Sequence, residues 1–122
     1  MKESTHSVGM HGEEKATQFL QAEGFSIIER NWRTRSGEID IIAQKDDVLV
    51  FVEVKTLPSG NLDTLSHELD ARKQRKIIKT ANFFLLKHRK YNRCRIRFDV
   101  LVIDMPGLMP VYHIQDAFSE FV

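Results

Sequence analysis

Apolar residues along the first half of the chain follow a helical period and then the denser pattern of buried strands. Over residues 10–23, Ala16, Phe19 and Leu20 recur at helical spacing, and Gly24 follows where a helix C-cap is expected. Runs rich in Ile, Val and aromatic residues come next and predict strands over residues 25–32, 38–43 and 48–54. The first half therefore predicts one helix followed by three strands.

The second half repeats this change of period. Pro58 and Gly60 interrupt the pattern and predict an exposed loop over residues 57–61. Residues 64–88 form the longest stretch of helical spacing and predict a second helix, with apolar positions at Leu65, Leu69, Ile77, Ala81, Phe84 and Leu85. Alternation over 96–102, a turn over 104–107 and a short apolar run over 111–114 predict a fourth and a fifth strand. The element order is αβββαβ with a small addition, which predicts an α/β fold with a mixed sheet flanked by helices.

Length and composition limit the protein classes that fit. A chain of 122 residues is one domain and is too short for a (β/α)₈ barrel, which needs about 250 residues. We expect a flexible N-terminal arm over residues 1–8 and a single domain over 9–122. The one cysteine, Cys94, excludes an internal disulfide and a zinc site built on thiolates. The chain has neither a run of about 18 apolar residues nor the apolar core of a signal peptide, so we expect a cytoplasmic protein without membrane contact.

Charge is distributed unevenly although the formal net charge is only +1. Residues 71–98 contain many Lys and Arg and no acid, whereas acidic residues dominate the first 70 positions. A basic block of this kind is suited to phosphate contacts, and a solvated helix face explains it equally well. On the first interpretation the residues that contact phosphates are Arg72, Lys73, Arg75, Lys76, Lys79, Lys87, Arg89, Lys90 and Arg93.

Three ionisable residues lie inside the two most apolar predicted strands: Asp40, Glu53 and Lys55. Burying an unpaired charge there would cost several kcal/mol, so each group needs a compensating partner. Adjacent strands lie about 4.8 Å apart, so Asp40 and Glu53 can converge on one cation with Lys55 beside it. Carboxylate oxygens are the ligands that Mg²⁺ prefers, with Mn²⁺ as an alternative. Two competing interpretations need no metal: a buried Glu53–Lys55 ion pair, or strand ends at which these residues reach water.

Polar residues on both predicted helices face the core and could reach the predicted cation site. Glu13 shares the buried stripe of the first helix, whereas Glu14 lies on its outer side. On the second helix, Lys73 and Gln74 continue the core-facing stripe and are candidates for accessory groups. Taken singly, a charge near a helix N-terminus explains Glu13, and a lysine stem that extends to solvent explains Lys73.

The motifs together resemble a known family. They are Gly12-Glu13, Gly37-Glu38-Ile39-Asp40, the run from Phe51 to Thr56 and Arg97-Phe98-Asp99-Val100. This series resembles the YraN family of bacterial proteins over residues 9–118. That family is regarded as having a restriction-endonuclease-like core of the PD-(D/E)xK type, similar to archaeal Holliday-junction resolvases. In this chain Ile39 stands where the signature has Pro.

The resemblance implies a Mg²⁺- or Mn²⁺-dependent endonuclease that hydrolyses phosphodiester bonds of DNA, on branched or junction substrates and as a homodimer. It implies that Asp40, Glu53, Lys55 and Glu13 are catalytic, that Asp40, Glu53 and the Val54 carbonyl hold the metal, and that Lys73, Gln74 and Glu38 are accessory. Two alternatives remain open: a catalytically inactive nucleic-acid-binding module with the same fold, and a structural or assembly subunit. DNA cleavage that disappears when Glu53 is replaced would distinguish the endonuclease from both of these alternatives.

Overall fold

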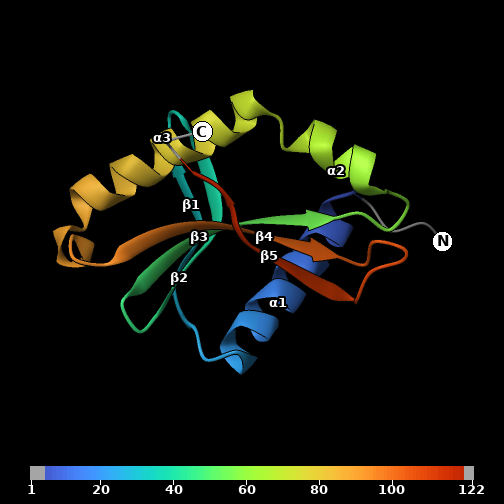
Figure 1. The fold of residues 1–122 in the computed structure, drawn as a ribbon, viewed down its shortest axis with the longest axis horizontal. Helices are drawn as coiled ribbons and strands as arrows, with labels where there is room; N and C mark the ends of the chain where they lie inside the picture. The colour runs from blue at the N-terminus through green and yellow to red at the C-terminus, as the bar shows by residue number, and fades with distance from the viewer. Residues whose placement is uncertain (1–4, 120–122) are drawn as a thin grey trace.

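The computed structural model describes residues 5–119 and arranges them in three layers, with a five-stranded sheet between helices (Figure 1). The elements in chain order are α1 (Thr5–Ala22), β1 (Ser26–Thr34), β2 (Gly37–Lys45), β3 (Val48–Thr56), α2 (Leu62–Glu68), α3 (Ala71–Lys87), the short 3₁₀ turn η1 (Arg89–Tyr91), β4 (Arg95–Ile103) and β5 (Val111–Phe118). No helix within residues 5–119 is long and apolar enough to cross a membrane.

The sheet is mixed, with the strand order β1-β2-β3-β4-β5. Strands β3 and β4 pair in parallel, and the other three pairs are antiparallel. A parallel pair needs a crossover connection, which α2 and α3 supply between β3 and β4. The predicted fold class, a mixed sheet flanked by helices, is confirmed.

The two faces of the sheet bury separate cores. Helix α1 packs Ala16 and Leu20 against Val50 and Val52, among others, and α3 packs Phe84 and its neighbours against the opposite face. Strand β3 lies in the middle of the sheet and is covered on both faces, which is why its sequence is a continuous apolar run. The charged residues at the end of β3 therefore lie at the border of the core and not in a loop.

Two predicted boundaries differ from the structure. Helix α1 begins at Thr5, so residues 5–8 are helical where an arm was predicted, while residues 1–4 lie outside the described residues. The predicted helix over 64–88 is wrong as one element, because it is divided at Leu69 and Asp70. The Asp70 side chain accepts a hydrogen bond from the N–H of Lys73 and so caps a new helix. Helix α2 consequently approaches the end of β3 separately from α3.

The predicted loop between β3 and α2 is confirmed, with one exception to its expected exposure. Pro58 and Ser59 are exposed, but Leu57 is buried in the core on the α3 side of the sheet. The N–H of Leu57 also donates to the carbonyl of Ile103, so the chain leaves the sheet only after this residue. The end of β3 is thereby fixed on the side where its charged residues lie.

Candidate functional site

Asp40 lies where strand β2 separates from strand β3. The last pair between the two strands joins Ile41 to Val52, whereas β2 stays paired with β1 as far as Gly37. Beyond the last pair, the N–H of Val54 donates to Asp40 Oδ2 at 2.8 Å instead of to a β2 carbonyl. The carboxylate of Asp40 is thus held by the backbone at the point where the sheet opens.

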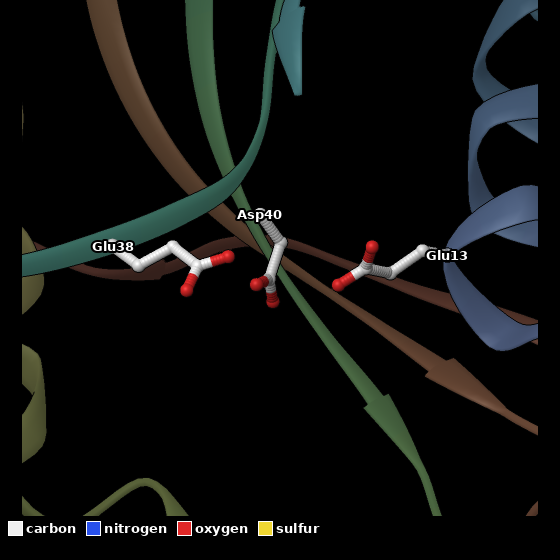
Figure 2. A group of neighbouring side chains, drawn as sticks. All are labelled: Glu13, Glu38 and Asp40. Atoms are coloured by element: carbon white, nitrogen blue, oxygen red, sulfur yellow. The ribbon is translucent and has the colours of Figure 1, made fainter. Parts of the chain in front are cut away.

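Three carboxylates meet at this opening and form the acid triad: Glu13, Glu38 and Asp40. One oxygen of each lies within 4.8 Å of the other two. Figure 2 shows Asp40 between the other two, with Glu38 reaching it along β2 and Glu13 from α1. The triad therefore joins the N-terminal helix to the sheet.

Gly12 allows α1 to approach the sheet closely enough for this contact. A Cβ atom on Gly12 would lie 1.9 Å from Thr56 Oγ1, a separation that real Cβ atoms essentially never show. Glycine is therefore required at this position by packing and not by backbone conformation. In the Gly12-Glu13 motif, Gly12 permits the close approach of α1 to the sheet, and Glu13 supplies a carboxylate to the acid triad.

The acid triad is electrostatically strained. Burial, followed by the negative charge of Glu53, raises the pKa of Asp40 to about 8; the Val54 hydrogen bond opposes this shift, and Glu13 and Glu38 add to it. Within residues 5–119 no Lys or Arg forms an ion pair with Asp40 or Glu13, and Glu38 pairs only with the exposed Arg33, at 3.2 Å. The negative charge gathered here is therefore largely unbalanced by the described part of the chain.

A cavity of about 270 Å³ adjoins the triad on the α3 side of the sheet. Lys55 projects into it with Nζ 3.6 Å from Glu53 Oε1 and 3.8 Å from Glu68 Oε2. Burial raises the pKa of Glu53, although the Lys55 ammonium opposes this shift. The remaining lining comes from Gly37, Glu38, Leu69, Lys73, Lys76 and Ile77. One ammonium group thus stands between two carboxylates at the wall of an open hollow.

The structure brings together most of the residues predicted from the sequence, with different partners for two of them. Asp40 forms the three-carboxylate cluster with Glu13 and Glu38 and without Glu53, although the charge of Glu53 acts on Asp40 more strongly than that of either of them. The sharing of one ion by Asp40 and Glu53 therefore stays a prediction, and so does a role for the Val54 carbonyl. Glu38, predicted as an accessory residue, contributes as directly to the triad as Glu13.

The two accessory candidates on α3 point to different places. Lys73 lines the cavity, as the sequence predicts. Gln74 donates through Nε2 to the carbonyl of Leu69 at 2.8 Å and lines a separate hollow with Arg75 and Lys79. Gln74 thus fixes the break between α2 and α3 and lies outside the cavity.

The predicted DNA-contacting residues are all exposed, but they do not form one cluster. Lys76 lines the cavity, and Arg72, Arg75 and Lys79 lie on the same helix. Helix α3 spans 17 residues, or about 25 Å at 1.5 Å per residue. The other four residues lie at and beyond its far end, namely Lys87, Arg89, Lys90 and Arg93.

Glu68 was missed by the sequence analysis because its position depends on the helix break. On a continuous helix it would be one more exposed acid, whereas the end of α2 brings it to Lys55. Asp70 was the available signal, because aspartate is favoured at helix N-caps.

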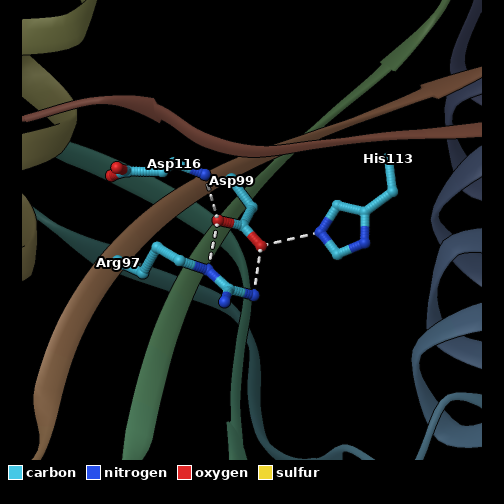
Figure 3. Close-up of polar contacts among 4 residues, drawn as sticks. All are labelled: Arg97, Asp99, His113 and Asp116. Carbon is cyan, nitrogen blue, oxygen red and sulfur yellow. Dashed lines mark hydrogen bonds and ion pairs between the residues drawn. The ribbon is translucent and has the colours of Figure 1, made fainter.

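A second polar cluster, the Asp99 network, lies on β4 and β5 and was also missed (Figure 3). Asp99 is fully buried and accepts hydrogen bonds from Arg97 Nε and Nη2, both at 2.9 Å, from His113 Nε2 at 2.7 Å and from the Asp116 N–H at 3.0 Å. Burial favours the neutral acid, but these donors together hold the pKa of Asp99 below its ordinary value. They fix the shift in register between β4 and β5.

Comparison with known proteins identifies relatives that match nearly the whole chain. Residues 12–103 match the sequence profile of a family described as "Uncharacterised protein family UPF0102". The chain is 43% identical over 125 residues to a UPF0102 protein of Treponema denticola, with 93% of this chain and 96% of the relative covered. It is also 43% identical to UPF0102 proteins of Persephonella marina (91% and 92% covered) and Geobacter metallireducens (93% of each covered).

Proposed function

The chain belongs to protein family UPF0102, the YraN family, and we propose that it is a metal-dependent endonuclease that hydrolyses phosphodiester bonds of DNA. The family description assigns no activity, so the proposal depends on the site. Its main support is one observation: the acid triad gathers negative charge at the opening of the sheet, beside a cavity walled by Lys55.

The donor set of the acid triad fits a hard divalent cation. Oxygens that share one Mg²⁺ at 2.0 to 2.1 Å lie at most about 4.2 Å apart, so the observed limit of 4.8 Å requires only small side-chain adjustments. Glu13, Glu38 and Asp40 would hold the ion, with Glu53 at the border between triad and cavity. When bound, Mg²⁺ or Mn²⁺ supplies Lewis acidity that neutralises charge on the attacked phosphate.

The residues of the chain orient and stabilise the reacting groups. The Val54 N–H fixes the direction of Asp40, which keeps the ligand set in place. Lys55 offers an ammonium group at the cavity wall that can stabilise the negative charge developing on a phosphate oxygen. Lys73 and Lys76 at the rim attract the phosphate backbone without selecting a base.

The proposal also covers partners and location. The exposed basic residues of α3 and η1 would follow the DNA backbone over a longer distance than the cavity alone. Symmetric cutting of both strands of a junction would require a second copy of the chain. The relatives are bacterial proteins, so the cytoplasm, where bacterial DNA lies, is the proposed location.

A Mn²⁺ titration with linear, single-stranded, flapped and four-way DNA tests this proposal. Glu13→Gln and Glu53→Gln should reduce cleavage to background, because each removes a negative oxygen from the site. Glu14→Gln is the matched control: it neutralises the next residue on α1, which is exposed and pairs with Arg30. The control should cut as the wild type does.

Each other result favours one of the alternatives. DNA binding by the wild type without cutting on any substrate, at any Mn²⁺ concentration, would favour the inactive binding module. Absence of DNA binding would favour a structural or assembly role. Equal loss of cleavage in Glu13→Gln and Glu14→Gln would show that the charge of α1, and not the triad, is what matters.

A further inference from the structure

A second hollow lies at the turn between β1 and β2, and we call it the hairpin hollow. It has a volume of about 330 Å³ and is lined by Arg33, Thr34, Arg35, Phe83 and Lys87. Three of these five residues are cations and none is acidic. Phe83 is 41% exposed and lies among these cations, so its aromatic ring is accessible to a ligand.

The hairpin hollow is held in a fixed relation to the cavity. The hydroxyl groups of Ser36 and Thr80 lie 3.1 Å apart and join the β1–β2 turn to α3. Gly37 lies against the same helix, because a Cβ there would be 3.1 Å from Thr80 Oγ1. On α3, Lys76 lines the cavity and Phe83 lines the hairpin hollow, about 10 Å apart along the helix axis.

Charge and shape together select the kind of ligand. A nucleobase offers a flat face for an aromatic ring, and the phosphates on either side of it offer charges for Arg and Lys. Inside a duplex both faces of each base are covered by stacking, whereas an unpaired base that has left the stack can present one face to Phe83. A protein partner would have to place several acidic side chains against these cations, whereas a nucleic acid supplies one phosphate with every nucleotide.

We propose that the hairpin hollow binds one unpaired base of a DNA strand, which stacks on Phe83 while Arg35 and Lys87 contact the flanking phosphates. The inference rests on the proposed function, because that function makes DNA the ligand. It adds that the substrate is single-stranded near the cleaved bond. The 10 Å between Lys76 and Phe83 corresponds to about three nucleotides of a stacked strand at 3.4 Å each.

Binding measured without divalent metal tests the inference separately from cleavage. In EDTA, the affinity for a fluorescent single-stranded oligonucleotide and for a duplex of the same sequence is read by anisotropy. Phe83→Ala should weaken single-strand binding about 5- to 150-fold, the range for one base–aromatic stack, and change duplex binding less than twofold. Phe83→Trp should keep or increase single-strand affinity, since its ring is larger.

Leu86→Ala is the matched control, because Leu86 is a large apolar residue of the same helix, 73% exposed, that does not line the hairpin hollow. It should bind both DNAs as the wild type does. Equal effects of Phe83→Ala on single strand and duplex, or no effect on either, would overturn the inference. If Phe83→Ala selectively loses single-strand affinity but the wild type never cuts DNA, the base-binding site stands and the proposed nuclease activity is refuted. If the wild type cuts DNA but Phe83→Ala shows no selective loss of single-strand affinity, only the base-binding site is refuted.

Discussion

Two aspartates on neighbouring parts of the sheet have opposite electrostatic environments. Asp99 is fully buried, yet Arg97, His113 and the Asp116 N–H all donate to it, and the pKa of its carboxyl is lowered. Asp40 has one backbone donor and several acidic neighbours, and its pKa is raised to about 8. Both residues interrupt apolar strands, so sequence pattern alone does not separate them.

The difference indicates which of the two is structural and which is available for chemistry. The donors around Asp99 belong to the chain itself, so its charge stabilises the fold and leaves no demand for a ligand. The fold concentrates acidic groups around Asp40, and among residues 5–119 no Lys or Arg forms an ion pair with Asp40 or Glu13. Such unfavourable arrangements are typical of functional sites, where stability is lost in exchange for binding.

The largest effect on stability is expected when the Asp99 network is broken. Asp99→Ala leaves Arg97 and His113 without their shared acceptor and should lower the free energy of unfolding by about 3 to 5 kcal/mol, measured with urea. The lowered pKa of Asp99 means that its contribution is complete above the ordinary value of 3.8 and is lost as pH falls below it. The difference between wild type and variant should therefore shrink in acid. A loss under 1 kcal/mol at pH 7 would contradict the structural role.

The approach of α1 to the sheet offers an effect of intermediate size. Gly12→Ala forces a Cβ against Thr56 and should cost about 1 to 3 kcal/mol, together with weaker Mn²⁺ binding as Glu13 moves away. Gly9→Ala on the same helix meets no atom within 4 Å and should stabilise by about 0.5 to 1 kcal/mol. Thermal and urea unfolding of both variants, with a Mn²⁺ titration, gives the comparison. The same sign for both substitutions would show that close packing at Gly12 is not important.

The smallest effect has the opposite sign. Asp40→Asn keeps an acceptor for the Val54 N–H and removes the crowded charge, so it should raise the free energy of unfolding by about 0.5 to 2 kcal/mol at pH 8 without metal. Because the pKa of Asp40 is raised from 3.8 to about 8, the wild type loses stability as pH rises through this window. The gain should therefore be small near pH 4 and grow toward pH 8. A pH-independent difference would contradict the electrostatic explanation.

Local periodicity was sufficient for most of the fold. Alternation and helical spacing depend only on neighbouring residues, so every strand was found, and Glu13 was separated correctly from the exposed Glu14. The helix break was missed because the apolar spacing continues from Leu65 to Ile77 across Asp70. The N-cap residue Asp70 determines where α3 begins, and the hydrophobic spacing gives no sign of this boundary.

The candidate site could be predicted only as far as its residues act within one element. Glu53 and Lys55 share a face of β3, and their proximity follows from the two-residue repeat of a strand. The membership of Glu38 in the triad depends on where β2 leaves β3, and the contact of Glu68 depends on where α2 ends. These are long-range geometric facts that a single sequence does not contain.

The parallel pairing of β3 with β4 has a consequence for how the protein folds. Residues 57–94, with both crossover helices, must close as a loop before these two strands can join, a step that slows folding more than it lowers stability. Lys73 and Lys76 travel with that loop, whereas the acid triad is complete within the first 40 residues. A nascent chain can thus gather its acids early, but it has no cavity until the last part of the sheet is in place.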